Sequence, residues 1–299
     1  MTQLEDERCC CSGIRICRHC VMSDRAQSII NCHVPLTKAC DVVEKQYSVE
    51  RISSCSFICI GASTHSFCSN CGKIFVFPER AIRACADHNG LTADSETTMR
   101  GLMVSPDFVS DIEEDYLLRF FDGAHHSRWK VSQSGRRKQD YGPRANFKKR
   151  KLKKGDGNGM PIQLKDIITR VNQFISNETM KRYQTIEVSV LEYSTKCGSS
   201  IDTHIDDTWL WGDRIGGLNL LEDVVLTLVD SKGTVATVFV PRRSFFLLSG
   251  ESRYNWMHGI RSEDIKSRRI SMTFREFADN LEVDERLLQD ILSFSLTFV

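Results

Sequence analysis

The 299-residue sequence lacks any apolar run that approaches the roughly 18 residues needed to cross a membrane. Residues 1–8 are polar and acidic, without the basic start and apolar core of a secretory signal. We therefore expect no membrane association. Hydrophobic residues make up 41% of the chain and charged residues 26%, which is ordinary for a globular protein. No feature predicts an obligate dimer, so we expect a monomer.

Cysteine is nearly absent from the later part of the chain. Twelve of the thirteen cysteines lie before residue 86, and only Cys197 lies beyond it. Without an export signal, this crowding indicates zinc binding rather than disulfides. Two clusters have spacings suited to tetrahedral zinc, and they are Cys9, Cys11, Cys17 and Cys20, then Cys68, Cys71, Cys85 and His88. The alternative for both clusters is a set of free, reduced thiols.

Residues 1–100 therefore form a small cysteine-rich, zinc-binding module, within which segment 31–67 shows no pattern that we can interpret. The second domain, residues 101–299, begins with a predicted helix. Ser110 can cap its start, and the helix should run to about residue 122 with Tyr116 among its buried residues. We expect a second helix over 162–177, with Phe174 facing inward, and a C-terminal amphipathic helix near 283–294.

After residue 182 the hydrophobic pattern alternates with a period of two, which is typical of strands. The expected strands cover 186–190, 224–229, 234–240, 244–248 and 269–277. Turn residues separate these strands, and no helical pattern lies between them. The sequence thus predicts a mainly β fold with flanking helices, in the form of a double-stranded β-helix, or jelly roll.

His204 and Asp206 are two residues apart, so on a strand both side chains project from one face. A third ligand, His258, could come from a neighbouring strand. Two imidazoles and one carboxylate form the facial triad that holds Fe(II) and leaves positions open for a co-substrate and O2. Arg269 and Arg275 follow, and an arginine fork suits a dicarboxylic keto acid. The alternatives are a surface His–Asp pair, a core histidine and solvent-facing arginines.

The motifs around these residues resemble the AlkB family of Fe(II)- and 2-oxoglutarate-dependent dioxygenases. They are Tyr193, segment 201–207, the Ser-Gly…Trp-x-His-Gly-Ile segment 249–260, and the closing motif 269–275. Ser271 stands where that motif usually has Asn, and Leu191 stands where Asn usually precedes the tyrosine. Segments 9–20, 132–143 and 207–212 are similar to the fourth AlkB-homologue branch.

The resemblance implies that His204, Asp206 and His258 hold the iron. The co-substrate residues would be Tyr193, Arg269, Thr273 and Arg275. The implied reaction is an oxidative demethylation that consumes O2 and 2-oxoglutarate, with ascorbate as reductant. It yields succinate and CO2, and the N-methyl group leaves as formaldehyde.

Positive charge is concentrated in residues 128–154, which contain twelve Lys or Arg and one acid. This net charge of +11 contrasts with +1 for the whole chain. Arg136, Arg137 and Tyr141 could clamp phosphates and stack a base. The stretch could equally be a nuclear import signal, a docking surface for an acidic protein, or a solvated loop. We expect a cytoplasmic and nuclear location.

The substrate follows only from the resemblance. That branch is associated with removing a methyl group from monomethyl-lysine on actin, within actomyosin, and we expect such a protein substrate. Trp209 and Trp211 could enclose the methylammonium group, although tryptophans in a sandwich are more often core residues. The alternatives are N6-methyladenine in DNA and a low-turnover, metal-stabilised adaptor.

Overall fold

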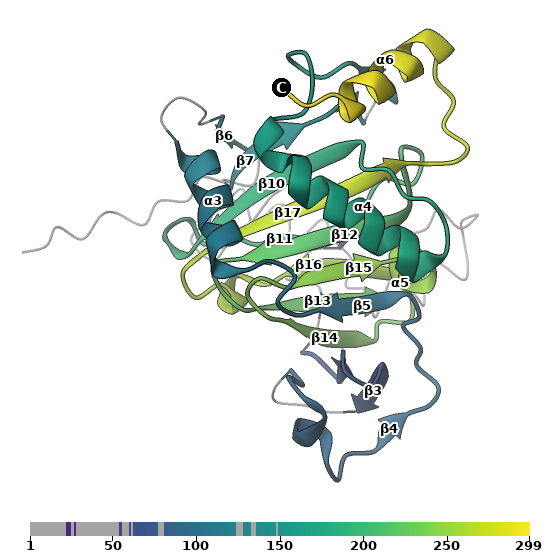
Figure 1. Ribbon diagram of the computed structural model, residues 1–299. Helices are drawn as coiled ribbons and strands as arrows, with labels where there is room; N and C mark the ends of the chain where they lie inside the picture. The colour runs from purple at the N-terminus through teal and green to yellow at the C-terminus, as the bar shows by residue number, and fades with distance from the viewer. Residues whose placement is uncertain are drawn as a thin grey trace, which may run out of the picture.

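The computed structural model describes residues 62–76, 81–123, 128–132, 136–147 and 149–299, with the short pieces 22–24, 27, 54–55 and 60. The predicted ligands Cys9, Cys11, Cys17 and Cys20 lie outside these residues. Two large β-sheets dominate the structure, and helices α3 (Asp111–Asp122) and α4 (Lys165–Thr179) lie over one of them (Figure 1). No helix in the described ranges is long and apolar enough to span a bilayer.

The sheet under these helices has seven strands. In spatial order they are β5 (Leu102–Ser105), β15 (Phe245–Leu248), β12 (Trp211–Leu220), β17 (Arg268–Phe277), β10 (Glu187–Ser194), β7 (Arg137–Tyr141) and β6 (Lys130–Val131).

The other sheet has eight strands. In spatial order they are β1 (Ser54–Cys55), β11 (Ile201–His204), β16 (Trp256–Ile260), β13 (Val224–Asp230), β14 (Val235–Val240), β2 (His65–Cys68), β3 (Lys73–Val76) and β4 (Ala93–Asp94). Strands β8 (Arg144–Asn146) and β9 (Lys151–Lys153) form a separate hairpin.

Strands β10 to β17 cross repeatedly between the two sheets. Strands β10, β12, β15 and β17 belong to the seven-stranded sheet, and β11, β13, β14 and β16 belong to the eight-stranded sheet. All pairings among these eight strands are antiparallel. This arrangement confirms the predicted jelly roll.

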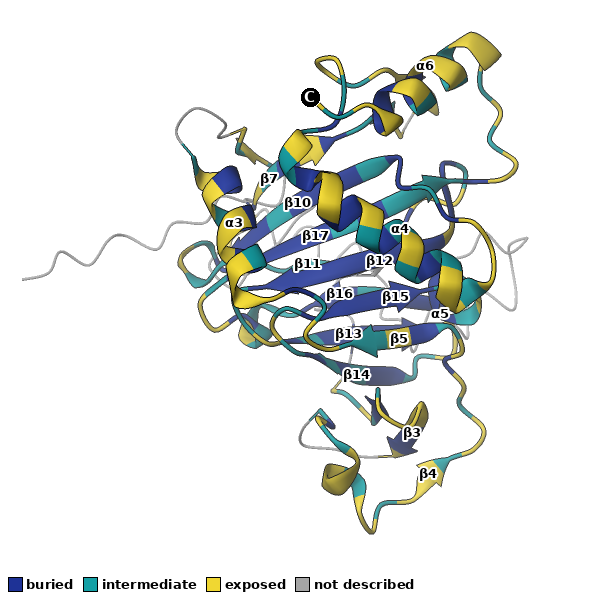
Figure 2. Ribbon diagram, in the orientation of Figure 1, coloured by how far each residue is buried: buried dark blue, intermediate teal, exposed yellow. Residues whose placement is uncertain are grey.

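Two apolar layers hold the seven-stranded sheet in place. The space between the sheets is filled by residues such as Leu228, Val238 and Trp256. The outer face of the seven-stranded sheet packs against α3 and α4 through residues such as Met272 and Ile168. In Figure 2 the strands beneath α4 are buried, whereas the helix is exposed on its outer side. Alternate side chains of these strands therefore point into the two apolar layers, one on each face of the sheet.

The helices agree with the sequence prediction in position but not in every buried residue. Ser110 caps α3 as expected, because its side chain accepts a hydrogen bond from the N–H of Glu113. Tyr116 is 51% exposed, so its predicted burial is wrong, whereas Leu117, Phe120 and Phe121 are buried as the sequence predicted. The C-terminal helix is α6 (Glu285–Leu296).

The described part of the N-terminal region joins the jelly roll rather than standing apart. Strand β2 pairs in parallel with β14, and β3 and β4 continue the sheet beyond it (Figure 1). Strand β1 pairs with β11. Both β1 and part of β2 fall in segment 31–67, where the sequence showed no pattern. The division at residue 100 stays a prediction.

Candidate metal centre and co-substrate pocket

His204, Asp206 and His258 converge between the two sheets. His204 ends β11 and lies directly opposite His258 on β16, with the ring centroids 4.5 Å apart. Asp206 follows two residues later, and its Oδ2 lies 3.5 Å from Nε2 of His258. The ligand atoms of all three side chains lie within 4.8 Å of one another. One metal ion could therefore contact all three.

The chemical state of these side chains suits a metal. Nδ1 of His204 lies 2.9 Å from the backbone carbonyl of Asp202, an interaction that leaves Nε2 available as a ligand. Burial lowers the pKa of His204, and burial together with the nearby His204 lowers the pKa of His258 to about 3. Both imidazoles are thus neutral, as metal ligands must be. Oδ2 of Asp206 is buried without a hydrogen-bond partner among the described residues, as expected of a coordinating atom.

Arg275 holds Asp206 in position. Its Nε and Nη2 donate to Oδ1 of Asp206 at 2.9 and 2.7 Å, and its Nη1 donates to Glu187 at 2.6 Å. Burial would raise the pKa of Asp206, but the charge of Arg275 outweighs it and holds this pKa well below its usual range. The sequence predicted Arg275 as a co-substrate contact. Its guanidinium instead binds two carboxylates, so we infer a positioning role for it.

Replacing Arg275 by lysine should weaken iron binding, because an ammonium cannot bridge Asp206 and Glu187 as the guanidinium does. Losing such an outer partner of a ligand typically costs about 10–100-fold in metal affinity. The measurement is the Fe(II) concentration needed for half-maximal succinate production. Arg214→Lys is the matched control, because Arg214 is also buried and binds Glu276 rather than a metal ligand. An unchanged iron requirement in Arg275→Lys would contradict the positioning role.

Arg269 forms a second polar centre on the inner face of the seven-stranded sheet. It is fully buried and lies opposite Tyr193, whose ring centroid is 4.9 Å from the guanidinium carbon. Its Nε donates to Oδ1 of Asn219 at 2.7 Å. Its Nη1 and Nη2 are buried and have no hydrogen-bond partner among the described residues. Two free donors on one buried cation form a fork that fits a carboxylate. Thr273 points to the same face, four residues along β17.

The sequence interpretation missed one residue of this pocket and misplaced another. Asn219 donates its amide hydrogens to the carbonyls of Glu222 and Pro241, which turns its oxygen towards Arg269. A lone asparagine in a buried strand was the available sign of this role. Arg136, predicted to hold phosphate, is only 6% exposed and donates to the Tyr193 hydroxyl at 2.9 Å. It belongs to the co-substrate side of the pocket.

Arg137 and Tyr141 lie on the opposite side of the sheet from the iron ligands, so the structure corrects their predicted substrate role. Arg137 pairs with Glu192 on the outer face, and Tyr141 packs in the core beneath the helices. Arg136 directly precedes β7 and donates to Tyr193 on the inner side, whereas Arg137 begins the strand and pairs with Glu192 on the outer side. The prediction that Arg136 and Arg137 form one phosphate clamp did not allow for neighbouring side chains of an extended segment facing opposite sides.

The two predicted substrate tryptophans differ in position. Trp211 is 3% exposed and stacks on Phe277, so it packs in the core between the sheets, and its contact with substrate stays a prediction. Trp209 is half-buried three residues after the ligand Asp206, and its ring packs edge-on against Phe147 at 6.5 Å. Its indole N–H is buried without a partner among the described residues. Trp209 therefore remains a candidate substrate contact.

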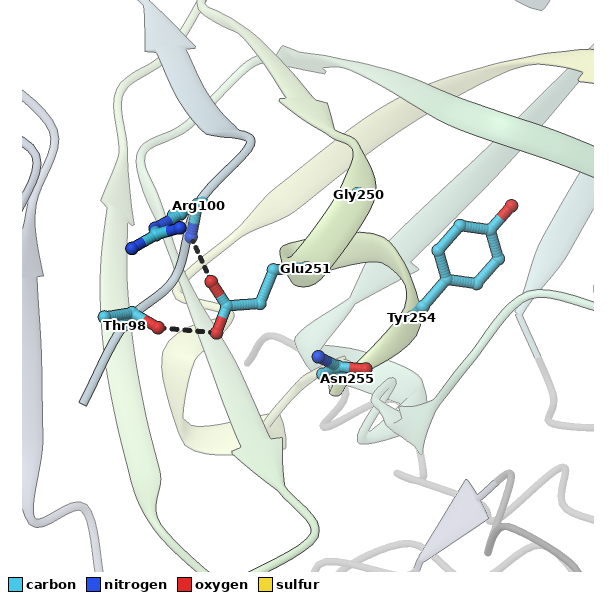
Figure 3. Close-up of a pocket in the computed structure, with 6 residues that line it drawn as sticks. All are labelled: Thr98, Arg100, Gly250, Glu251, Tyr254 and Asn255. Atoms are coloured by element: carbon cyan, nitrogen blue, oxygen red, sulfur yellow. Dashed lines mark hydrogen bonds between the residues drawn. The ribbon is translucent and has the colours of Figure 1, made fainter. Parts of the chain in front are cut away.

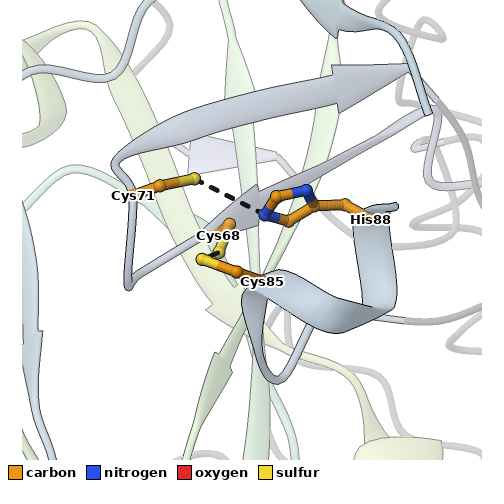
Figure 4. A group of neighbouring side chains, drawn as sticks. All are labelled: Cys68, Cys71, Cys85 and His88. Atoms are coloured by element: carbon orange, nitrogen blue, oxygen red, sulfur yellow. Dashed lines mark hydrogen bonds between the residues drawn. The ribbon is translucent and has the colours of Figure 1, made fainter. Parts of the chain in front are cut away.

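A cavity of ≈ 560 Å³ opens beside α5 (Gly250–Tyr254), where Glu251 accepts hydrogen bonds from Thr98 and the backbone of Arg100 (Figure 3). Glu251 is the one carboxylate among its lining residues, and its hydrogen bonds fasten the chain before β5. The four side chains of the predicted zinc cluster, Cys68, Cys71, Cys85 and His88, lie together (Figure 4). Burial raises the pKa of its Cys68 thiol to about 11.

Comparison with known proteins gives close relatives, although no family profile matches the sequence. The DNA N6-methyl adenine demethylase of Caenorhabditis elegans is 30% identical over 286 residues, covering 94% of this chain and 92% of that protein. The alpha-ketoglutarate-dependent dioxygenase alkB homolog 4 of Mus musculus is 34% identical over 232 residues, covering 65% of this chain and 75% of that protein. The Homo sapiens alkB homolog 4 is also 34% identical, with coverage of 66% and 75%.

Proposed function

The chain belongs to the AlkB family of Fe(II)- and 2-oxoglutarate-dependent dioxygenases, and from this premise we propose that it removes the methyl group of N6-methyladenine in DNA. The enzyme class predicted from the sequence is confirmed by these relatives. The identity of the substrate is our proposal. The observation that carries it is a basic, aromatic rim beside the metal centre, formed by Phe147 and the exposed lysines and arginine of the β8–β9 hairpin.

The residues of the two polar centres suit the cofactors of this class. His204, Asp206 and His258 would hold Fe(II), because one buried oxygen and two neutral imidazoles converge there. Arg269 would bind the far carboxylate of 2-oxoglutarate through its two free Nη groups. When bound, iron and co-substrate supply the O2-dependent oxidation of an N-methyl group, which then leaves as formaldehyde. Arg275 fixes the carboxylate ligand, and burial keeps water from Arg269.

The rim beside the metal centre is formed by the turn of the β8–β9 hairpin. Phe147 in this turn is 46% exposed and packs against Trp209, three residues after Asp206. The exposed cations around it are Lys149, Arg150, Lys151 and Lys153. Positive charges that flank an exposed aromatic ring suit a phosphate backbone with a stacked base. The Caenorhabditis elegans relative, which is named for DNA N6-methyladenine, supports the same substrate.

Monomethyl-lysine on a protein such as actin is the second candidate, and a different observation favours it. Asp207 is exposed next to the iron ligand Asp206, and Trp209 lies two residues further on. A carboxylate and an indole together can bind a methylammonium group. The basic rim would then contact an acidic surface of the protein substrate.

One competition experiment tests both candidates. The enzyme receives an N6-methyladenine oligodeoxynucleotide and a monomethyl-lysine peptide in one reaction with Fe(II), ascorbate and 2-oxoglutarate. We expect loss of 14 mass units (about one methylene) from the DNA, with about one succinate formed for each methyl group lost. Loss from the peptide alone would reject the DNA proposal. Absence of succinate in every mixture would indicate that the protein is a low-turnover, metal-stabilised adaptor rather than an active demethylase.

The rim should also determine how DNA affinity depends on salt. Lys151→Gln with Lys153→Gln removes two exposed cations that flank the buried Leu152. Each lost phosphate contact should reduce the slope of log affinity against log salt by about 0.9. We expect weaker binding and a slope reduced by about 1 to 2, measured by fluorescence anisotropy.

The matched control is Lys165→Gln with Lys232→Gln, which removes two exposed lysines outside the hairpin. This control should leave the salt slope of DNA binding unchanged. An equal slope in wild type and the Lys151/Lys153 variant would remove the hairpin from the DNA interface.

A further inference from the structure

We propose that Cys68, Cys71, Cys85 and His88 bind one structural Zn²⁺, which fastens the strands β2, β3 and β4 to the edge of the jelly roll at β14. The site is separate from the iron centre and does not depend on the proposed substrate. All four donor atoms lie within 4.8 Å of one another, and the four side chains point to a common centre (Figure 4).

The distances between the donor atoms fit a tetrahedral zinc ion. Sγ of Cys68 lies 3.9 Å from Sγ of Cys85, and Sγ of Cys71 lies 3.6 Å from Nε2 of His88. Zinc–sulfur and zinc–nitrogen bond lengths at tetrahedral angles give about 3.8 Å between two sulfurs and about 3.6 Å between sulfur and nitrogen. A disulfide requires a separation of about 2.05 Å, which this sulfur pair does not have.

Local backbone structure presents the first ligand pair. Cys68 ends β2, and Cys71 lies in the turn that leads to β3. Gly72 has φ of +68°, and its N–H donates to the carbonyl of Cys68 at 2.8 Å. A positive φ favours glycine, so this residue permits the tight turn that brings both thiols to one side. The turn therefore does more than join β2 to β3, because it also places the first two ligands side by side.

The second ligand pair comes from the short helix η2 (Cys85–His88). The carboxylate of Asp87 accepts hydrogen bonds from the backbone N–H groups of Arg83 and Ala84, which fixes the start of the helix. The ring of His88 stacks on Phe75 of β3 with centroids 4.1 Å apart. This contact orients the imidazole towards Cys71.

The surroundings of the site are too small to hold it together without a metal. Among the described residues, the local apolar cluster contains three buried residues, Cys68, Phe75 and Ile82, with the partly buried Leu91 packed against them. Cys71 and Cys85 are exposed, so burial does not account for their convergence. Metal binding commonly replaces a core in such short segments. Zinc would thus supply the free energy that the apolar contacts lack.

Zinc bound here would stabilise the edge of the eight-stranded sheet. The guanidinium of Arg83, two residues before Cys85, lies 4.5 Å from the ring centroid of Phe239 on β14. Strand β2, which carries Cys68, pairs with the same β14. A zinc ion bound to Cys68 and Cys85 would link the Arg83–Phe239 contact to the pairing of β2 with β14. Without β2, strand β14 would be an open edge available to other chains.

The test is the zinc content of the full chain, measured by mass spectrometry of the metal after purification. Cys71→Ser with Cys85→Ser should contain about one zinc ion less per chain than wild type. The matched control Cys197→Ser changes a cysteine outside the cluster and should keep the wild-type content. Equal zinc in wild type and the double variant would overturn the proposal.

Alkylation of the wild-type protein provides a test that does not require the variant to fold. Cys71 and Cys85 are exposed, so as free thiols they would react rapidly with iodoacetamide. We expect their alkylation to be at least about tenfold faster after a zinc chelator is added. Rapid alkylation before chelation would overturn the proposal. A Cys68–Cys85 disulfide, found in the untreated protein by peptide mapping, would also overturn it.

Discussion

Changing His204 and Asp206 together to alanine should abolish iron-dependent succinate production. These two residues supply two of the three side chains that converge on the metal centre. Loss of a single outer partner already costs about 10–100-fold in metal affinity, so loss of two direct ligands should lower activity by more than about a thousandfold. The measurement is succinate formed from 2-oxoglutarate with saturating iron, with and without a methylated substrate.

The chain offers a closely matched control for this double variant. His65 and Asp94 form another histidine–aspartate pair in the eight-stranded sheet, with Nε2 and Oδ2 3.2 Å apart. His65→Ala with Asp94→Ala removes the same side-chain types without contact with the iron ligands. It should retain activity if the fold is intact. Succinate production that survives in His204→Ala with Asp206→Ala would refute the proposed metal centre.

The sequence predicted the jelly roll from local periodicity, and it predicted the metal ligands from short motifs that resemble those of the AlkB family. Alternation in β13, β14 and β17 marked these segments as strands. The same alternation placed His204 and Asp206 on one side of the chain. The motif around His258 added the third ligand. Each of these inferences requires only residues that lie close together in the sequence.

The contacts that orient the ligands could not be predicted in the same way, because they join distant strands. Asp206 is held by Arg275, which lies 69 residues later, and Arg269 is held by Asn219, which lies 50 residues earlier. The pairing of Arg269 with Asn219 depends on the register of β12 against β17. The sequence indicated a polar residue at each position but gave no partner for it.

The attachment of the N-terminal region was hidden for a similar reason. Strand β2 pairs with β14 from more than 160 residues away, and its parallel direction excludes a simple hairpin. Strand β2 has only four residues, too few to establish a periodic pattern. Arg136 and Arg137 show the opposite error, since two residues adjacent in the sequence, at the start of β7, were predicted to face the same side.

Changing Arg269 to methionine should weaken 2-oxoglutarate binding without unfolding the protein. Arg269 is fully buried, and its Nη1 and Nη2, which have no hydrogen-bond partner in the described part of the chain, can bind the far carboxylate. Truncating one partner of a buried, hydrogen-bonded charge pair costs about 2–5 kcal/mol, which corresponds to about 30-fold to several thousandfold in affinity. The measurement is the dissociation constant of 2-oxoglutarate with Mn²⁺ in place of iron.

In Arg269→Met the affinity for 2-oxoglutarate should fall, whereas the free energy of unfolding of the ligand-free protein should stay equal or rise. Without co-substrate, a buried guanidinium with two unpaired groups destabilises the fold, and methionine removes this cost. The lost bond to Asn219 offsets part of the gain. We therefore expect the ligand-free variant to melt at the wild-type temperature or above it, and 2-oxoglutarate to raise its Tm little.

The adjacent Arg268 separates these effects from those of removing any arginine from β17. Its guanidinium faces outward and binds Asp122 and Glu192 at 2.7 Å. Arg268→Met should therefore lower the Tm of the ligand-free protein while leaving the stabilisation by 2-oxoglutarate intact. If 2-oxoglutarate raises the Tm of Arg269→Met as much as that of wild type, its far carboxylate does not bind Arg269. The opposite responses expected at two adjacent residues follow from the alternation of the strand.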